Sequence, residues 1–303
     1  MTTFTDLVGC AEPLQLAGMG GGISDAPLTS AVCDAGGFGM LGGSGFAPLG
    51  ELLDEMGDRL FGVNFLMPFL DLEAVKLAAS RAKVVEFFYG DPSLELVTLV
   101  HDGGALAAWQ VGSPDEASAA VAAGCDFIVA QGAEAGGHVR GTQPLDGLLA
   151  ALHVEVPIVA AGGIGTADDV VRVMERGAAA VRVGTRFLAA RESCAHPLYV
   201  GALVGASSAD TVLTEAFSVG WPNAPHRVLR SCVDAADGLE DDTVATLRTP
   251  GGDIPLPRFG TIPPTKNVFG RISAMALYAG TSVDAVTRRE PAADIVAELT
   301  SKL

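Results

Sequence analysis

Short apolar runs alternate with segments of helical length, and this alternation constrains the fold more than any other feature of the sequence. The apolar runs lack strict polar–apolar alternation, as expected for parallel strands that are buried on both faces. Strand–helix alternation repeated eight times predicts an α/β protein of the (β/α)8, or TIM barrel, type. The expected strands are Leu14–Gly18, Phe38–Leu41, Leu60–Asn64, Val84–Phe88, Ala105–Val111, Phe127–Ala130, Ile158–Ala161 and Ala180–Val183.

The segments between these strands carry signs of helix ends. Asp25, Ser113 and Thr166 are candidate N-caps, and Gly36 and Gly177 stand where helices should stop. The sequence therefore predicts helices over Ala26–Ala35, Pro48–Met56, Leu72–Ala79, Ser93–His101, Asp115–Ala123, Leu145–Leu152 and Ala167–Arg176.

An open, doubly wound sheet shares the same alternation. Its dinucleotide fingerprint should follow the first strand, but Gly18-Met19-Gly20 is not continued by a third glycine that opens a helix. Glycine-rich loops suited to a phosphate come late in the chain instead, which favours the closed barrel.

The pattern changes after Thr185. We expect the barrel over residues 1–205, a cap or substrate-binding subdomain over 206–264, and C-terminal helices over 265–303 that pack back on the barrel. Helices are expected over Phe187–Gly205 apart from Pro197, over Gly270–Ala279 and near Ala292–Lys302, with irregular structure over Ala206–Gly260.

The composition excludes several classes of partner. A net charge of −17 argues against nucleic acid and against an acidic membrane surface. No apolar run reaches membrane-spanning length, and the first residues do not resemble a signal peptide. The five cysteines form no CxxC pair and show no metal-ligand spacing, so we expect free thiols, no metal and a cytoplasmic setting. The composition permits a homodimer without requiring one.

Two consecutive glycine-rich loops predict a phosphate site. The seventh strand runs into Ala161–Thr166 (AGGIGT), and the eighth runs into Gly184-Thr185. In barrels the loops after strands seven and eight commonly bind phosphate, because glycine lets main-chain N–H groups approach the oxygens. The alternative is a pair of tight turns without a ligand.

The loop after the sixth strand places a histidine at the same end of the barrel. Gln131–Gly141 reads QGAEAGGHVRG, and the imidazole of His138 can exchange a proton near neutral pH. Gln131 and Asn64, at strand ends, are candidate hydrogen-bond partners for a planar heterocycle. Glu134 is a possible second acid–base group, although a role in bracing the loop is the simpler interpretation.

At these residues the chain resembles the nitronate monooxygenase family, formerly called 2-nitropropane dioxygenases. The resemblance rests on Leu16–Ser24 (LAGMGGGIS), Leu28–Gly39 (LTSAVCDAGGFG), Gln131–His138 (QGAEAGGH), Val159–Ile164 (VAAGGI) and Val183–Leu188 (VGTRFL). It implies an FMN-dependent barrel without metal, in which His138 is the catalytic base. The FMN contacts that it implies are Gly18, Met19, Gly20, Asn64, Gln131, Gly136, Gly137, Gly162, Gly163, Arg182, Val183, Gly184 and Thr185.

Three positions depart from the family pattern. Gly18 stands in place of the usual proline, and Thr281 in place of the usual glutamine. Gly220-Trp221-Pro222 stands in place of a Gly-Arg-Pro segment. Because the cap shapes the pocket, the last departure leaves the substrate open.

The resemblance implies FMN-dependent oxidation of alkyl nitronates or nitroalkanes with O2. His138 would remove the α-proton of a nitroalkane or orient a nitronate, and its imidazolium would favour an anionic substrate. A second hypothesis is an FMN-dependent enoyl-thioester reductase that uses NAD(P)H, in which His138 donates the proton. A third is a non-catalytic flavin- or phosphate-binding protein of a larger assembly. A purine-nucleotide dehydrogenase is set aside, because residues 131–141 lack the cysteine it requires.

Overall fold

The computed structural model describes residues 3–43, 47–249 and 251–303, and within them the predicted strands form one parallel sheet. The strand order is β1-β9-β8-β6-β5-β4-β3-β2, and a parallel bridge between Gln15 and Phe38 joins the first strand to the last. The sheet therefore closes, which confirms the (β/α)8 barrel. Its strands are β1 (Leu14–Leu16), β2 (Gly39–Gly42), β3 (Phe61–Leu66), β4 (Val84–Phe88), β5 (Leu106–Val111), β6 (Phe127–Gln131), β8 (Ile158–Ala161) and β9 (Ala180–Val183).

Helices surround the barrel, and their starts follow the predicted caps. The side chains of Asp25 and Ser113 accept hydrogen bonds from main-chain N–H groups of the first turn, and Thr166 forms a capping box with Asp169. The helices are α2 (Ala26–Asp34), α3 (Leu49–Met56), α4 (Leu72–Ala79), α5 (Leu94–Asp102), α6 (Pro114–Ala122), α7 (Leu145–Ala151) and α8 (Ala167–Glu175).

Two further helices complete the barrel. The C-terminal helix α12 (Ala292–Thr300) contacts α2 and α8, so it fills the eighth place in the ring. The helix α1 (Phe4–Val8) was not predicted. Its Phe4 ring lies edge-on to Phe38 and Phe127, with centroids 6.2 and 5.4 Å away, and contributes to a buried apolar cluster of barrel residues.

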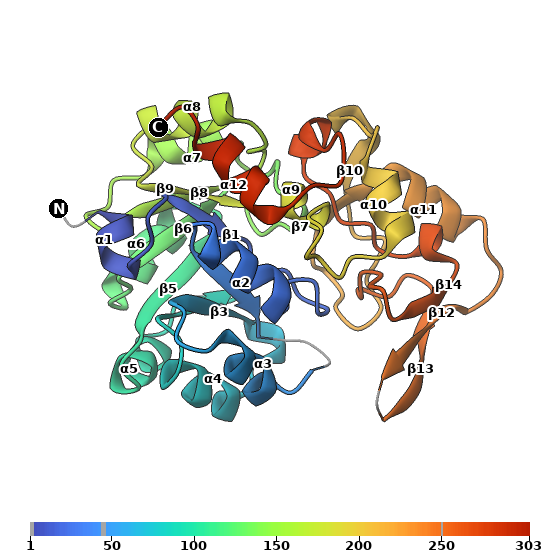
Figure 1. Cartoon of the computed structure of the whole chain (residues 1–303), viewed down its shortest axis with the longest axis horizontal. Helices are drawn as coiled ribbons and strands as arrows, with labels where there is room; N and C mark the ends of the chain where they lie inside the picture. The colour runs from blue at the N-terminus through green and yellow to red at the C-terminus, as the bar shows by residue number, and fades with distance from the viewer. Residues whose placement is uncertain (1–2, 44–46, 250) are drawn as a thin grey trace.

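The chain leaves the barrel after α9 (Thr185–Leu188), builds a cap and returns as α12. Figure 1 shows the cap on the right and both termini on the barrel side. The cap contains the antiparallel sheet β13-β12-β14 and a second one, β10-β11-β7, whose strand β7 (Gly137–His138) comes from the loop after β6. Its elements are α10 (Pro197–Leu203), β10 (Thr211–Thr214), β11 (His226–Leu229), α11 (Arg230–Asp237), β12 (Thr243–Thr249), β13 (Gly252–Pro257), β14 (Val268–Gly270) and the 3-10 helices η2 (Ser208–Asp210), η3 (Ile272–Ala274) and η4 (Thr281–Ala285).

Several cap predictions were wrong. No continuous helix covers Phe187–Gly205, because α9 ends at Leu188 and Pro197 begins a separate helix, where its fixed φ suits the first turn. The expected helix over Gly270–Ala279 is replaced by the end of β14 and by η3. The segment Ala206–Gly260 is not irregular, because it holds four strands and a helix. These strands pair over long sequence distances, which local periodicity does not reveal.

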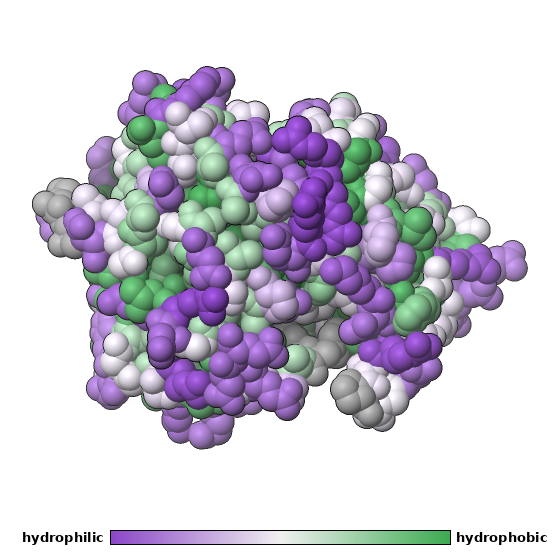
Figure 2. Space-filling model, in the orientation of Figure 1, coloured by the Kyte–Doolittle hydropathy of each residue, from purple (hydrophilic) through white to green (hydrophobic). Residues whose placement is uncertain are grey.

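Among the residues described, no helix is long and apolar enough to cross a membrane. In the view of Figure 2 hydrophilic residues are spread over both the barrel and the cap, with smaller hydrophobic areas between them. All five cysteines lie within the described ranges and are free thiols.

Candidate active site

A cavity of about 660 Å³ opens at the carboxyl ends of the barrel strands, where the cap meets the barrel. Every predicted site residue except Val183 lines it. Val183 lies in the apolar core, and its carbonyl accepts a hydrogen bond from the N–H of Ala17. The predicted residues that line the cavity are Gly18, Met19, Gly20, Asn64, Gln131, Gly136, Gly137, His138, Gly162, Gly163, Arg182, Gly184 and Thr185.

An ion pair inside the barrel supports the floor of the cavity. The guanidinium of Arg182 and the carboxylate of Glu86 are both buried, and they form hydrogen bonds to each other. The remaining N–H groups of Arg182 donate to Gln15 Oε1 and, at 2.7 Å, to Gln110 Oε1. All five N–H donors of this guanidinium therefore have partners in the protein. Arg182 was expected to contact FMN, but in this arrangement its polar groups position neighbouring side chains.

These contacts fix which atom of each amide is left for a ligand. A carboxylate only accepts, so Asn64 Nδ2 must face Glu86, at 2.7 Å, and Asn64 Oδ1 remains as an acceptor. Gln110 Oε1 is used by Arg182, which leaves its amino group as a donor. Gln131 Nε2 donates to the carbonyl of His138 at 3.0 Å, and Gln131 Oε1 is buried without a partner among the described residues. The edge of a flavin presents one donor, N3–H, between acceptors, so amide groups that offer both acceptor and donor atoms suit it.

The two glycine-rich loops have the backbone that close approach to a ligand requires. Gly162 and Gly163 have φ angles of +105° and +69°, which favour glycine. The main-chain N–H groups of Gly163 and Thr185 have no acceptor within the described residues. The hydroxyl of Thr185 accepts the N–H of Gly280 at 3.0 Å, and its own proton remains available. The loops thus offer donors to a phosphate in a chain of strongly negative charge.

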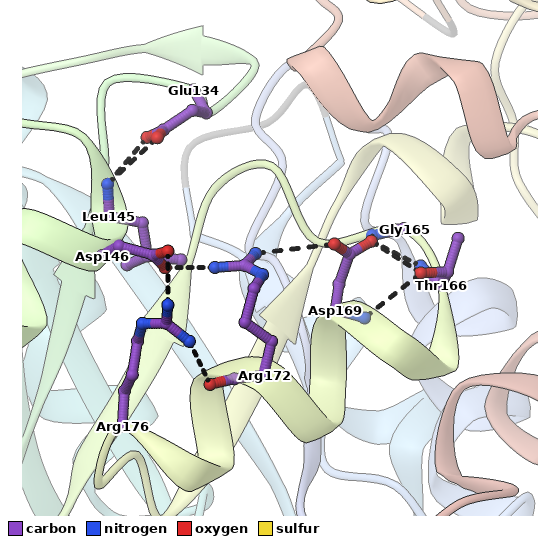
Figure 3. Close-up of polar contacts among 8 residues, drawn as sticks. All are labelled: Glu134, Leu145, Asp146, Gly165, Thr166, Asp169, Arg172 and Arg176. Atoms are coloured by element: carbon purple, nitrogen blue, oxygen red, sulfur yellow. Dashed lines mark hydrogen bonds and ion pairs between the residues drawn. The ribbon is translucent and has the colours of Figure 1, made fainter.

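Figure 3 shows polar contacts that brace the histidine loop and the glycine-rich loop after β8. The Glu134 carboxylate accepts the N–H of Leu145 at the start of α7, with its two oxygens 2.9 and 3.1 Å away. Asp146 pairs with Arg172, which lies 3.5 Å from Asp169. Glu134 therefore braces the loop, as the simpler interpretation predicted. The polar contacts drawn involve Glu134, Leu145, Asp146, Gly165, Thr166, Asp169, Arg172 and Arg176.

The cap positions His138. Gly137 and His138 form the short strand β7, which pairs with β11 of the cap so that His138 lies opposite His226. The Trp221 ring stacks on the imidazole, with centroids 3.9 Å apart and planes inclined by 22°. His138 Nε2 is buried and has no hydrogen-bond partner among the described residues.

His138 is neutral in this environment. Burial, with a smaller contribution from nearby His226, lowers its pKa from 6.5 to about 3. The expectation that an imidazolium would favour an anionic substrate is therefore wrong for this structure. A neutral imidazole with an unpaired nitrogen is a proton acceptor, which is the state that a general base needs.

Sequence reasoning missed the residues that support these groups. Glu86 is a lone carboxylate in an apolar strand, and Gln110 a lone amide in the next, and both could have been noticed because buried polar groups need partners. Trp221 was noticed as a departure from the family pattern, but its position against His138 depends on the fold of the cap.

Fold and site together define a (β/α)8-barrel protein with a ligand cavity at the carboxyl ends of its strands. Residues 62–302 match the family model described as nitronate monooxygenase. The chain belongs to this family, whose members are generally flavin-dependent enzymes acting on small molecules.

Three known proteins that resemble this chain differ in the activities that their names give. The chain is 32% identical over 241 residues to (3aS,4S,5R,7aS)-5-hydroxy-7a-methyl-1-oxo-octahydro-1H-indene-4-carboxyl-CoA dehydrogenase of Mycobacterium tuberculosis, covering 76% of this chain and 66% of that protein. It resembles the structure of a nitroalkane oxidase from Streptomyces ansochromogenes, with 29% identity, a TM-score of 0.74 and coverage of 99% and 97%. It also resembles FabK of Thermotoga maritima, with 26% identity, a TM-score of 0.79 and coverage of 99% and 96%.

Proposed function

We propose that this enzyme catalyses the FMN-dependent oxidation of nitroalkanes or alkyl nitronates, with O2 as the final electron acceptor. The observation that carries the proposal is the neutral, unpaired imidazole of His138 in the cavity above a floor of oriented amides. A neutral base can remove the acidic proton on the carbon next to a nitro group.

The cofactor assignment rests on two parts of the cavity. Asn64, Gln110 and Gln131 would hold the ring edge, and the glycine-rich loops that follow β8 and β9 would hold the phosphate. Bound FMN would accept the electrons of the deprotonated substrate and pass them to O2.

The protein itself binds, orients and deprotonates the substrate. Trp221 covers one face of His138, which keeps water from the base and keeps it neutral. The pairing of β7 with β11 holds the imidazole against the cavity. In a nitroalkane reaction, His138 would hold the proton taken from the α-carbon.

Anaerobic mixing of the FMN-loaded enzyme tests this proposal. Loss of the oxidised flavin absorbance on mixing with a nitroalkane or propyl nitronate, but not with NADH, is the expected result. Rapid bleaching by NADH alone, with none by either nitro compound, would overturn it.

The second candidate is an FMN-dependent enoyl-thioester reductase that uses NAD(P)H. It is favoured by the likeness to FabK over nearly the whole chain and by a relative whose name contains a carboxyl-CoA group. We rank it second because the family model that matches residues 62–302 is described as nitronate monooxygenase, whereas the likeness to FabK is at 26% identity. The cytoplasmic location of the protein and its possible assembly as a homodimer stay predictions.

A further inference from the structure

Aromatic side chains from both the barrel and the cap wall the end of the cavity around His138. Trp221 is only 7% exposed and stacks on the imidazole. Phe69, which also lines the cavity, and Tyr89, which is not part of the lining, form T-shaped contacts with the indole, with centroids 5.2 and 4.7 Å away. Tyr278 lies 5.7 Å from the imidazole on the side of the cap. Such edge-on and stacked arrangements hold aromatic rings in defined positions.

The backbone around this wall adopts unusual conformations. Tyr89 has a φ of +66°, which is costly for a residue with a side chain. Gly220, directly before Trp221, has a φ of +92°, and Asn223 has a φ of +56°. Strained residues persist only where the surrounding structure holds them, and here they place the two rings that pack on each other.

The same end of the cavity lacks a free positive charge. The formally charged side chains that line the cavity in the described residues are Asp71 and Arg182. Asp71 caps α4, and Arg182 is paired with Glu86. An anion placed against the aromatic wall would lose its water without gaining a counter-ion, which is unfavourable.

The hydroxyls of the two tyrosines in the cavity lining are also engaged. Tyr199 donates to the carbonyl of Tyr278, and Tyr278 donates to the carbonyl of Thr261 at 2.8 Å. The imidazole of His138 is left to meet the polar part of a substrate, because its Nε2 has no partner among the described residues.

We propose that Trp221 is a specificity-determining residue, and that the site selects substrates whose reacting carbon carries an uncharged, flat, apolar group. For the reaction the inference rests on the proposed function, so an aryl-substituted nitroalkane is the preferred class. A carboxylate-bearing nitro compound is disfavoured, and so is a small one that leaves the aromatic wall uncovered.

A substrate series tests the selection with the FMN-loaded enzyme. 2-Phenylnitroethane, nitroethane and 3-nitropropionate carry a flat apolar group, almost no side chain and a carboxylate, respectively. We expect kcat/KM to be about ten- to a hundredfold higher for 2-phenylnitroethane than for nitroethane, since its ring becomes buried against aromatic neighbours. 3-Nitropropionate should be the poorest. Equal values, or a preference for 3-nitropropionate, would overturn the proposal.

Substitutions of Trp221 test which residue makes the selection. Trp221→Leu should reduce the preference for the phenyl compound to a few fold, whereas Trp221→Phe should keep most of it. Phe269→Leu is the matched control, because Phe269 is half exposed on β14 and does not line the cavity. An unchanged preference in a folded Trp221→Leu would contradict the assignment, and if that variant does not fold, the wild-type series still decides.

Binding without turnover separates this inference from the proposed function. Trp221 is one of two tryptophans, and the other, Trp109, is buried in the barrel. Quenching of tryptophan fluorescence by 2-phenylnitroethane but not by 3-nitropropionate, lost in Trp221→Phe, would support the inference even if no nitro compound bleached the flavin. Bleaching by all three compounds without preference would support the function and overturn the inference.

Discussion

The two ends of the cavity are lined by side chains of different chemistry. The barrel end is a floor of amides whose orientations are fixed by the buried pair of Glu86 and Arg182. The cap end is a wall of aromatic rings around His138, without a free cation among the described residues. We infer from this difference that the barrel end binds the cofactor and that the cap end determines substrate specificity. A substitution at the cap end should therefore leave FMN affinity unchanged, and a substitution at the barrel end should leave substrate preference unchanged.

The largest effect is expected for His138→Ala, which should change the rate of the reaction but not the binding of FMN. His138→Ala should lower kcat by about 10²- to 10⁴-fold, since it removes the general base, while the affinity for FMN stays within a few fold. Stopped-flow flavin reduction and FMN titration measure the two quantities.

His153→Ala is the control for this variant, because His153 is exposed and bonds only to the nearby carbonyl of Ala151. It should leave both quantities unchanged. Full activity in His138→Ala would refute its role as the base.

The next effect tests the rigidity of the barrel end. Glu86→Gln leaves the buried Arg182 without its counter-charge, so the free energy of unfolding should fall by about 3–5 kcal/mol. Glu73→Gln removes an exposed ion pair with Lys76 and should cost at most about 1 kcal/mol. Chemical denaturation compares the two, and equal losses would show that the buried pair does not support the floor.

A smaller effect concerns the phosphate loops. Gly163→Ala puts a side chain at φ +69°, with its Cβ 3.0 Å from Glu134, so FMN should bind about tenfold or more weakly. Gly177→Ala carries similar strain at φ +92° at the end of α8, but its Cβ would meet no atom within 4 Å. It should lower thermal stability without weakening FMN. Equal FMN affinity in the two variants would argue against a phosphate at Gly163.

The barrel could be predicted from the sequence because the patterns that define its strands and helices each lie within a short segment of the chain. Each strand is a short apolar run, and caps such as Thr166 lie directly before their helices. The Gln131–His138 motif and the glycine-rich loops directly follow strands. Once the strands were predicted, these segments could be placed at the carboxyl end of the barrel.

The cap could not be predicted in the same way. Its strand β11 pairs with β7, about 90 residues earlier in the sequence, and this pairing brings His226 beside His138. The stacking of Trp221 on His138 and the low pKa that results from burial both depend on this contact. The imidazolium form of His138 was therefore predicted wrongly, although its position in the cavity at the carboxyl end of the barrel was predicted correctly.

The most direct test of a neutral base is the pH dependence of anaerobic flavin reduction by a neutral nitroalkane. Between about pH 5 and pH 8, where an ordinary histidine titrates, a base with a pKa of about 3 stays deprotonated. The account predicts a second-order rate constant that does not fall as the pH is lowered through this range. A rate that drops about tenfold per pH unit below 6.5 would show that His138 becomes protonated there, and would contradict the account.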